Sequence, residues 1–514
     1  MSETTATPTP TLSSGPVNEP KKPKTKFGQW LDAYFSISQR GSTIGRELIG
    51  GLIIFLAMFY ILPVNSNMLT GWASLSSGSN VIVVDGVLNI VLWEGVYAPV
   101  AAVYAGIFAA TAISAAITTL IMGFFGKLPV GLASGMGINS LIGYTVMLAM
   151  GYNFAQSMCI VFLDGILFLI ISLTPIRAWI VRSIPKSLKI AISGGIGFFI
   201  AFIGLQDMKI VVADSNTCVA LGDFTSPYVI MSIVGLVLVL VLSSLPKNNK
   251  VCLWISRLSV IISMVVMGII CASMGTAGVA DMPTFYDSSY NISNLGNFSK
   301  VFGACFHGFD VLAKPEAYAL VFTLLFIDFF DTTGTLVGVE QGAGMVDDNG
   351  NITVNDQPAM VTDAVGTVIG SVCGTTTVTS FVESTTGVAA GARTGLAAVT
   401  TGLLFALSLA IYPALAMFSK SCVTGLALVY VGVCMFSNLA KLDWKNWVGV
   451  SSGFITVLMM IVTYSISDGI AWGFIAYTVM SLASKSFKKS DIPVACVSAA
   501  FLVLYIVEYS TGVK

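Results

Sequence analysis

Long apolar stretches alternate with short polar ones along most of this chain. A helix that crosses a bilayer needs about 20 mostly apolar residues, and roughly fifteen stretches approach that requirement. The candidate spans are 46–69, 98–124, 132–150, 155–175, 188–205, 226–245, 252–277, 316–336, 359–372, 378–392, 394–417, 422–439, 446–464, 467–484 and 491–509. Two of them, 359–372 and 378–392, are short and rich in Gly, Thr and Ser, which predicts interrupted helices. The pattern predicts an all-α, polytopic membrane protein.

The composition supports a membrane protein and excludes a soluble one. Of the 514 residues, 55% are hydrophobic and only 10% are charged, whereas a soluble protein carries about 25% charged residues. The 50 glycines fit close helix packing and interrupted helices. The nine cysteines include no CxxC pair and no metal-binding spacing. We therefore expect no cofactor, no metal and no nucleic-acid partner.

The charges predict the orientation of the chain. Residues 1–45 are rich in Pro, Thr and Ser and then basic, which predicts a disordered cytoplasmic tail. Basic residues recur in the loops 176–189 and 246–251, whereas 70–97 and 206–225 carry acidic ones. Because basic loops stay on the cytoplasmic side, the pattern predicts a multi-pass plasma-membrane protein with its N-terminus inside.

The two halves of the chain share one plan. We divide it into a first half, 46–277, an extracytoplasmic loop, 278–314, and a second half, 315–510. Each half has a Gly/Ser/Thr-rich third segment, at 131–140 and at 374–384. An odd number of spans separates the starts of the halves, so the repeats are expected to be inverted. Paired interrupted segments of this kind point to the binding site of a transporter.

Two aspartates, Asp328 and Asp331, lie in an otherwise apolar segment. A charge at the centre of a membrane helix costs a few kcal/mol or more, and residues three apart share a helical face. We expect this face to line a cavity, bind a ligand or exchange protons, because burial favours the neutral form of a carboxylate. Thr332 and Thr333 could instead satisfy Asp331 locally. His307 falls in the outer loop, which disfavours histidine as the intramembrane proton carrier.

Asn139 and Glu383 lie near the starts of the two half-helices that follow the third segments. The free N–H groups of such half-helices point to the middle of the membrane. Asn139 offers a donor and an acceptor, and Glu383 offers acceptors, or a donor when protonated. A flat heterocycle with alternating N–H and C=O groups fits such residues. The alternatives are a capping box of Ser380 with Glu383, and for Asn139 a helix cap or interhelical hydrogen bonding.

Two more polar residues are open to two interpretations each. Asp164, in an apolar span, could be a second titrating site or could bond a neighbouring helix, and the second interpretation is favoured. Asn65 follows Pro63 and could line the pocket or satisfy the backbone of a broken helix. Both interpretations of Asn65 remain open.

Five motifs resemble the AzgA-like purine permeases, the hypoxanthine/adenine/guanine branch of the nucleobase–ascorbate/xanthine–uracil permease superfamily. They are Arg46-Glu-Leu-Ile-Gly-Gly-Leu52 with Tyr60-Ile-Leu-Pro-Val-Asn65, Gly135-Met-Gly-Ile-Asn139, Ile184-Pro-Lys-Ser-Leu-Lys-Ile-Ala-Ile-Ser-Gly-Gly-Ile-Gly197, Asp328-Phe-Phe-Asp-Thr-Thr-Gly-Thr-Leu-Val-Gly338 and Thr379-Ser-Phe-Val-Glu-Ser384 with Gly387-Val-Ala-Ala-Gly391. The resemblance covers about 45 to 465 of this sequence, with the motifs in order.

The resemblance implies about fourteen spans in two inverted repeats of seven, with spans 3 and 10 interrupted. It implies a core domain of spans 1–4 and 8–11 and a gate domain of spans 5–7 and 12–14, and it favours merging two of the C-terminal segments. Relatives import purine bases with protons, and many members of the superfamily form dimers. The implied protein is a secondary active transporter and not an enzyme, with rocking or elevator-like alternating access and with a homodimer as one possible assembly.

The functional positions of the resembling family fall on Asn139, Asp328, Asp331 and Glu383. Together with Asn65, these residues form the expected substrate site. The expected proton-coupling residues are Asp328, Glu383 and Asp164, with Na⁺ as the alternative coupling ion.

The chain departs from the resembling family at several positions. The family usually has Asn-Pro after the first span, where this chain has Asn65-Ser66. It usually has a Pro at position 134 and Ala with aromatics after Asn139, where this chain has Ser134 and Ser140. Asp164 replaces an expected small residue. These changes leave open a purine-like heterocycle as the substrate, and less strongly an anion transporter or channel of the same fold.

Overall fold

The computed structural model describes residues 25–74, 76, 80–174, 185–214, 218–246, 250–285, 291–343, 345, 356–418, 420–463 and 466–511. The first half of the predicted tail and most of the basic loop 176–189 lie outside these residues. The described chain is mostly helical, as the hydrophobic pattern predicts.

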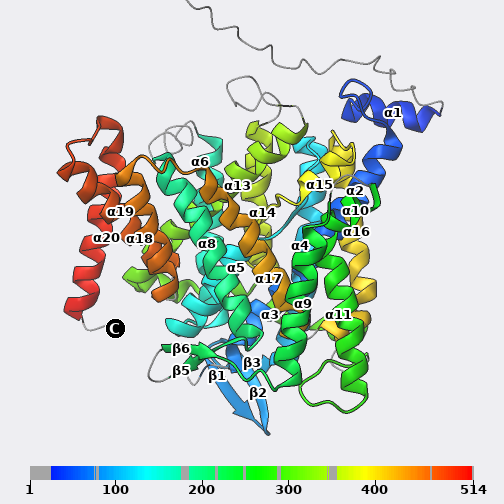
Figure 1. Cartoon of the computed structure of the whole chain (residues 1–514), viewed down its shortest axis with the longest axis horizontal. Coiled ribbons are helices and arrows are strands. Elements are labelled where there is room, and N and C mark those ends of the chain that lie inside the picture. Colours follow the sequence, from blue (N-terminus) through cyan, green and yellow to red (C-terminus); the bar gives the residue numbers. More distant parts are fainter. Residues whose placement is uncertain are drawn as a thin grey trace, which may run out of the picture.

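The helices follow one another along the whole described chain (Figure 1). They are α1 (Lys26–Phe35), α2 (Ile44–Met58), α3 (Ile61–Gly71), α4 (Val100–Ile121), α5 (Met136–Ser140), α6 (Phe154–Leu173), α8 (Lys186–Asp207), α9 (Pro227–Ser243), α10 (Lys250–Arg257), α11 (Ser259–Thr276), α12 (Phe298–Val301), α13 (Pro315–Ala343), α14 (Asp356–Cys373), α15 (Ser384–Ala389), α16 (Gly395–Leu407), α17 (Ser421–Phe436), α18 (Trp447–Val462), α19 (Ile466–Ala483) and α20 (Ile492–Thr511). A π-helical segment, Leu141–Ala149, continues α5, and a 3₁₀ segment, Ser408–Phe418, continues α16.

The membrane character of the chain is confirmed. Among the described residues, 7 helices are long and apolar enough to cross a membrane, and four shorter apolar helices accompany them. The predicted C-terminal segments correspond to α18, α19 and α20, of which α18 packs against α19 and α19 against α20. The chain is therefore a multi-pass membrane protein, while the count of about fourteen spans and the inverted repeats stay predictions.

The all-α expectation is wrong in one respect, because the described chain also contains three small sheets. Strands β1 (Val81–Val84), β2 (Val87–Trp93) and β3 (Val96–Pro99) form an antiparallel sheet, and β5 (Val211–Asp214) pairs with β6 (Cys218–Leu221). These two sheets lie together at the lower end of the molecule in Figure 1. The third sheet pairs β4 (Leu132–Ser134) with β7 (Val378–Ser380), which are far apart in the sequence.

The helices pack in two groups of contacts. In one group α14 packs against α4 and α6, α16 against α2 and α4, and α13 against α6. In the other group α17 packs against α8 and α9, and α18 against α8. Glycines let α8 and α17 approach closely, because a Cβ at Gly197 would lie 2.8 Å from the carbonyl oxygen of Gly432.

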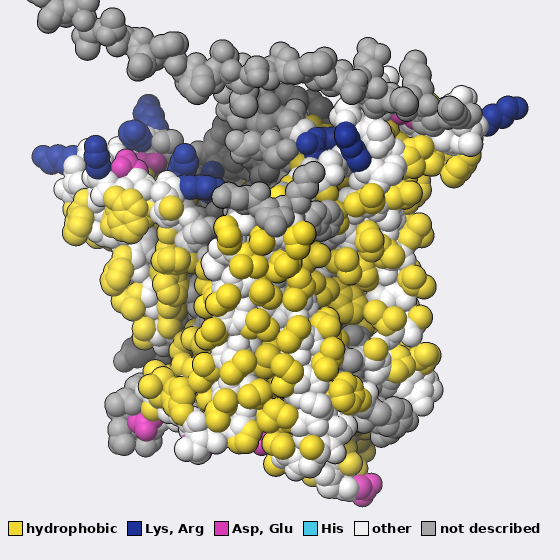
Figure 2. Space-filling view, turned by 45° about the vertical axis from the view of Figure 1, so that its right-hand side comes forward, with side chains coloured by type: hydrophobic (Ala, Val, Ile, Leu, Met, Phe, Trp, Pro, Cys, Tyr) yellow, Lys and Arg dark blue, Asp and Glu magenta, His cyan; other side chains and the backbone are white. Residues whose placement is uncertain are grey.

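The surface divides into an apolar band and a basic end. Figure 2 shows hydrophobic side chains over the middle of the molecule, with Lys and Arg at the upper end. Helix α1 lies at this same upper end in Figure 1, opposite the sheet of β1, β2 and β3. The basic end is the one that the positive-inside rule assigns to the cytoplasm. The cytoplasmic N-terminus itself stays a prediction.

Candidate functional site

Strands β4 and β7 bring the two interrupted segments side by side. They pair antiparallel, with Leu132 opposite Ser380 and Ser134 opposite Val378. The pairing satisfies backbone groups that no helix satisfies here, which a membrane interior demands. Helix α5 starts directly after β4, and α15 starts four residues after β7. The predicted extended backbone is thus present in both segments, although the pairing between them was not foreseen.

Asn139 lies on α5, and its amide oxygen is hydrogen-bonded whereas its amide nitrogen has no partner among the described residues. Its side chain is fully buried, and Oδ1 accepts hydrogen bonds from Ser134 Oγ at 3.0 Å and from Thr376 Oγ1. Nδ2 has no hydrogen-bond partner among the described residues. A buried donor without a partner costs about 1–3 kcal/mol. Asn139 therefore bonds the two extended segments rather than a neighbouring helix, and its amide nitrogen can still donate to a ligand.

Asn65 lies on α3 and leaves an acceptor open instead. Its Nδ2 donates to Thr111 Oγ1 at 2.7 Å and to Thr375 Oγ1 at 2.8 Å. Its Oδ1 has no partner among the described residues, although the side chain is fully buried. Thr375 Oγ1 lies 3.5 Å from Ser134 Oγ, and Ser134 Oγ donates to Asn139 Oδ1. The side-chain amides of Asn65 and Asn139 therefore belong to one polar network.

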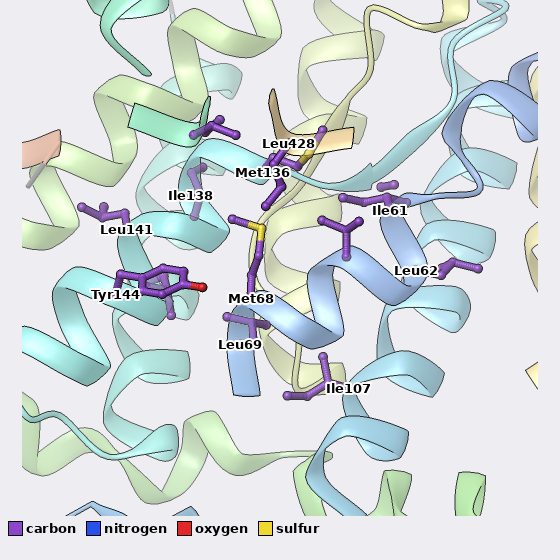
Figure 3. Packing of buried hydrophobic residues seen from close by; sticks show 14 of the residues in the cluster. Ile61, Leu62, Met68, Leu69, Ile107, Met136, Ile138, Leu141, Tyr144 and Leu428 are labelled. Atoms are coloured by element: carbon purple, nitrogen blue, oxygen red, sulfur yellow. The ribbon is translucent and has the colours of Figure 1, made fainter. Parts of the chain in front are cut away.

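An apolar wall packs around this network. Met68 and Leu69 of α3 lie near Met136 and Ile138 of α5, and Leu428 of α17 lies beside Met136 (Figure 3). Each of these side chains is buried. Because the surroundings are apolar, hydrogen bonds made here gain strength and unpaired polar atoms cost more.

Glu383 does not form the predicted capping box. It stands at the N-terminal end of α15 without a side-chain capping bond, and its Oε1 accepts a hydrogen bond from the hydroxyl of Tyr60 at 2.7 Å. Tyr430 and Cys434 of α17 lie close enough for their side chains to interact with its charge. Glu383 is half-buried. It therefore lies where the two groups of helices meet, free of the local role that its motif suggested.

Asp363 on α14 is the functional residue that sequence reasoning missed. Its Oδ1 accepts from Ser380 N at 2.7 Å and from Ser380 Oγ at 2.6 Å. Its Oδ2 accepts from Thr332 Oγ1 and from Thr379 Oγ1 at 3.1 Å. The carboxylate thus joins α13, α14 and β7, just before α15 begins. Its occurrence in the Gly/Thr-rich stretch 359–372 was the available signal.

The two aspartates of α13 face different neighbours. Asp328 is fully buried; its Oδ2 accepts from Thr367 Oγ1 at 2.8 Å, and its Oδ1 has no partner in the described chain. Asp331 is half-buried, and its charge interacts with those of Asp363 and Glu383. Local satisfaction of Asp331 by Thr332 is wrong, because the Thr332 hydroxyl donates to Asp363.

Asp164 on α6 lies beside Asp328, close enough for the two charges to interact. The side chain is fully buried, and neither of its oxygens has a hydrogen-bond partner within the described part of the chain. The favoured interpretation, a hydrogen bond to a neighbouring helix, is therefore wrong. Helix α6 approaches α14 here because a Cβ at Gly165 would lie 2.9 Å from Val368 N.

The structure thus brings the predicted residues together in two places. Asn139 and Asn65 share one polar network beside the β4–β7 pair, with Glu383 three residues beyond β7 and bonded to Tyr60, whereas Asp328 and Asp164 lie between α13, α14 and α6. Asp331 and Asp363 lie between the β4–β7 pair and the pair of Asp328 and Asp164.

Comparison with known proteins agrees with this architecture. Residues 87–472 match the Xan_ur_permease model, described as a permease family. The chain is 33% identical to the adenine permease AdeQ of Escherichia coli over 92% of this chain and 95% of AdeQ. It is 34% identical to the guanine/hypoxanthine permease PbuO of Bacillus subtilis over 88% of this chain and 95% of PbuO.

Solved structures show the same fold at low sequence identity. The transmembrane domain of the cyanobacterial bicarbonate transporter BicA is similar with a TM-score of 0.56 and 12% identity, covering 83% of this chain and 96% of BicA's domain. SLC26A9 is similar with a TM-score of 0.53 and 11% identity, covering 86% of this chain and 66% of that protein. With the family model matching most of its length, the chain belongs to the Xan_ur_permease family of membrane permeases.

Proposed function

We propose that this permease imports purine bases of the adenine, guanine and hypoxanthine class together with protons. As a member of a permease family it is a transporter and not an enzyme. Relatives at 33% and 34% identity over nearly their whole length are named adenine and guanine/hypoxanthine permeases. The observation that carries the proposal is the set of unfilled hydrogen-bonding atoms around the β4–β7 pair.

These atoms suit the edge of a purine. Tyr60 occupies one oxygen of Glu383, and the rest of the acceptor capacity of the carboxylate remains for N–H groups of a base. Asn139 Nδ2, which has no partner among the described residues, can donate to a ring nitrogen or a carbonyl oxygen. Asn65 Oδ1, likewise without a partner in the described chain, offers an acceptor in the same network. A ligand that pairs with all three groups removes the cost of leaving them unpaired in the apo site.

The departures from the resembling family do not disturb this chemistry. Ser66 Oγ donates to Leu62 O at 3.0 Å, and Ser140 Oγ donates to Met136 O at 3.0 Å, so both hydroxyls bond within their own helices. Ser134 differs, because it donates to Asn139 Oδ1. That bond fixes the amide with its donor outward, which favours a substrate that presents an acceptor. A purine-like heterocycle with the same edge remains the alternative substrate.

Transport requires the site to open to each side of the membrane in turn. In our proposal, α2–α6 and α13–α16 form a core that moves against a gate of α8–α11 and α17–α20, as rocking or elevator-like alternating access. Glu383 supports this division, because it belongs to the first group and lies near Tyr430 and Cys434 of the second. The fourteen spans, the inverted repeats, a homodimer and a cytoplasmic N-terminus belong to the same proposal.

An anion transporter is the less favoured candidate. It is suggested by the fold likeness to BicA and SLC26A9, which at 12% and 11% identity concerns the fold alone. Half-helix N-termini attract anions. The carboxylates of Glu383 and Asp331 at the start of α15 oppose an anion, however. An anion transporter requires Glu383→Gln to raise the uptake of its anion.

The test is uptake of labelled hypoxanthine by cells that lack their own nucleobase carriers. Unlabelled adenine, guanine, xanthine and uracil serve as competitors, and a protonophore removes the proton gradient. We expect uptake that one or two purines block and the protonophore abolishes, and Glu383→Gln should reduce it at equal surface levels. Absence of uptake and of competition, with the protein present in the membrane, refutes purine transport. Uptake that needs a Na⁺ gradient instead refutes proton coupling.

A further inference from the structure

We infer that the transported proton is held by the buried pair Asp164–Asp328, apart from the carboxylate that meets the substrate. This inference rests on the proposed function and names the site of its coupling ion. Asp164 comes from α6 and Asp328 from α13, and each side chain is 0% exposed. Gly165, the residue after Asp164, packs against Thr367, whose hydroxyl donates to Asp328 Oδ2 at 2.8 Å, so both carboxyls lie at the contact of α6, α13 and α14.

The hydrogen bonds separate this pair from the other acids of the core. Asp363 accepts four hydrogen bonds from Ser380, Thr332 and Thr379, which stabilise it as an anion. Asp328 accepts one hydrogen bond, and Asp164 accepts none within the described chain. An ionised carboxylate without donors is very costly in an apolar interior.

In the described part of the chain, the charged groups around the pair are acidic. The charges that act on Asp328 are those of Asp164, Asp363 and Asp331. Glu383, at the start of α15, acts on Asp331. His307 and Asp310 belong to the segment that packs on the Gln156 end of α6, about two helical turns from Asp164. Two neighbouring carboxylates without a cation share a proton, because both cannot be ionised together.

The open atoms of the pair fit a proton better than a metal ion. Among the described residues, three carboxylate oxygens have no hydrogen-bond partner, namely both of Asp164 and Oδ1 of Asp328. A hard cation needs about six oxygen ligands, and in the described part of the chain no group of three or more His, Cys, Asp or Glu could hold a metal ion. One proton needs only a donor oxygen and an acceptor oxygen, which the two carboxylates supply.

A chain of interacting acids connects the pair to the substrate site. Asp331 interacts with Glu383 on one side and with Asp328 on the other. A change of charge at Glu383 when a base binds is therefore felt at the pair, two steps away. Coupling through this chain needs no direct contact between proton and substrate.

The experiment uses the purified full-length protein in liposomes and separates exchange from accumulation. Exchange of labelled for unlabelled hypoxanthine needs substrate binding and alternating access but no net proton movement. Accumulation driven by a pH difference of one unit needs coupling, and one proton per base supports about tenfold accumulation. For Asp164→Asn, which mimics a protonated Asp164, we expect exchange within about threefold of wild type and no accumulation.

Two further variants complete the test. Asp164→Glu restores a carboxyl and should restore accumulation, which a purely structural role of the position would not predict. Asp468→Asn, on α19, is the matched control and should leave both activities intact, because Asp468 is bonded by Tyr505 of α20 and this hydrogen bond stays within the other group of helices.

The outcomes of the two assays distinguish the inference from the proposed function. Wild-type liposomes that exchange no purine overturn the proposed function and the inference with it. Wild-type exchange together with full proton-driven accumulation by Asp164→Asn overturns the pair alone. The assignment of the proton to the pair is also overturned if Asp164→Asn is monodisperse but no longer exchanges hypoxanthine, because Asp164 would then serve substrate binding. Accumulation driven by Na⁺ in wild type also overturns the assignment of a proton.

Discussion

Asp363 is expected to be the residue on which the geometry of the site depends most. It accepts four hydrogen bonds, two from Ser380 and one each from Thr332 and Thr379. A bond to a charged group contributes about 1.5–3 kcal/mol. In Asp363→Ala the two threonine hydroxyls can pair with each other, since they already lie 2.9 Å apart. The N–H and hydroxyl of Ser380 lose their acceptor, so we expect a loss of about 3–5 kcal/mol.

A graded series of variants tests this reasoning. Asp363→Asn keeps the oxygen that serves Ser380, and its amide can donate to the threonine hydroxyls, so the expected loss is only about 1–2 kcal/mol. Ser380→Ala removes one hydroxyl donor and should cost about 1 kcal/mol. Asp468→Asn, which is bonded by Tyr505 within the α19–α20 pair, is the control. We therefore expect stability to fall from wild type through Ser380→Ala and Asp363→Asn to Asp363→Ala.

Two measurements check the series. Thermal unfolding of the detergent-purified protein gives the order of stability, and hypoxanthine uptake at equal surface levels gives the effect on the site. Uptake should fall further than stability alone explains, because Ser380 sets the entry to α15 and hence the position of Glu383. If Asp363→Ala melts at the same temperature as wild type and transports with the same KM, the carboxylate does not hold the site and the reasoning fails.

Three further predictions concern single contacts. Tyr60→Phe removes the 2.7 Å hydrogen bond to Glu383 and should change the KM for the base by about tenfold, as the concentration dependence of uptake would reveal; an unchanged KM would mean that Tyr60 does not tune the carboxylate. Gly165→Val places a Cβ about 2.9 Å from Val368 N and should lower thermal stability by about 1–3 kcal/mol, with wild-type stability as the contrary result. Asn139→Ala removes the open Nδ2 and should abolish uptake while the protein still reaches the surface; normal uptake would exclude Asn139 from the substrate site.

The sequence predicted the helices well because hydropathy is a local property. The stretch 188–205 appears as α8 and 226–245 as α9, each within a few residues of the prediction. The β4–β7 pair escaped prediction because its two strands are three residues long and come from opposite halves of the chain. Only the tertiary fold makes them neighbours, and neither strand has a hydrophobic alternation long enough to be recognised.

The site was predicted unevenly for a similar reason. Asn139 and Glu383 could be singled out as candidates because polar residues beside small ones stand out in an apolar segment. The capping box was wrong, since Ser380 has a stronger acceptor in Asp363 than in the glutamate three residues on. Asp363 itself was missed because its importance comes from donors on other elements, which no local motif records.

The supply of hydrogen-bond donors explains why acids so close together can have different tasks. Asp363 accepts four hydrogen bonds, so it can hold α13, α14 and β7 together throughout transport. Glu383 has one donor from Tyr60 and lies at the meeting of the two helix groups, so its remaining capacity is available to a ligand. Asp164 has no donor among the described residues, and this leaves protonation as the remaining way to stabilise it. If the acids divide their tasks in this way, a hydrogen-bond donor introduced beside Asp164 should weaken proton coupling without weakening substrate binding. The added hydrogen bond would stabilise the ionised form of Asp164.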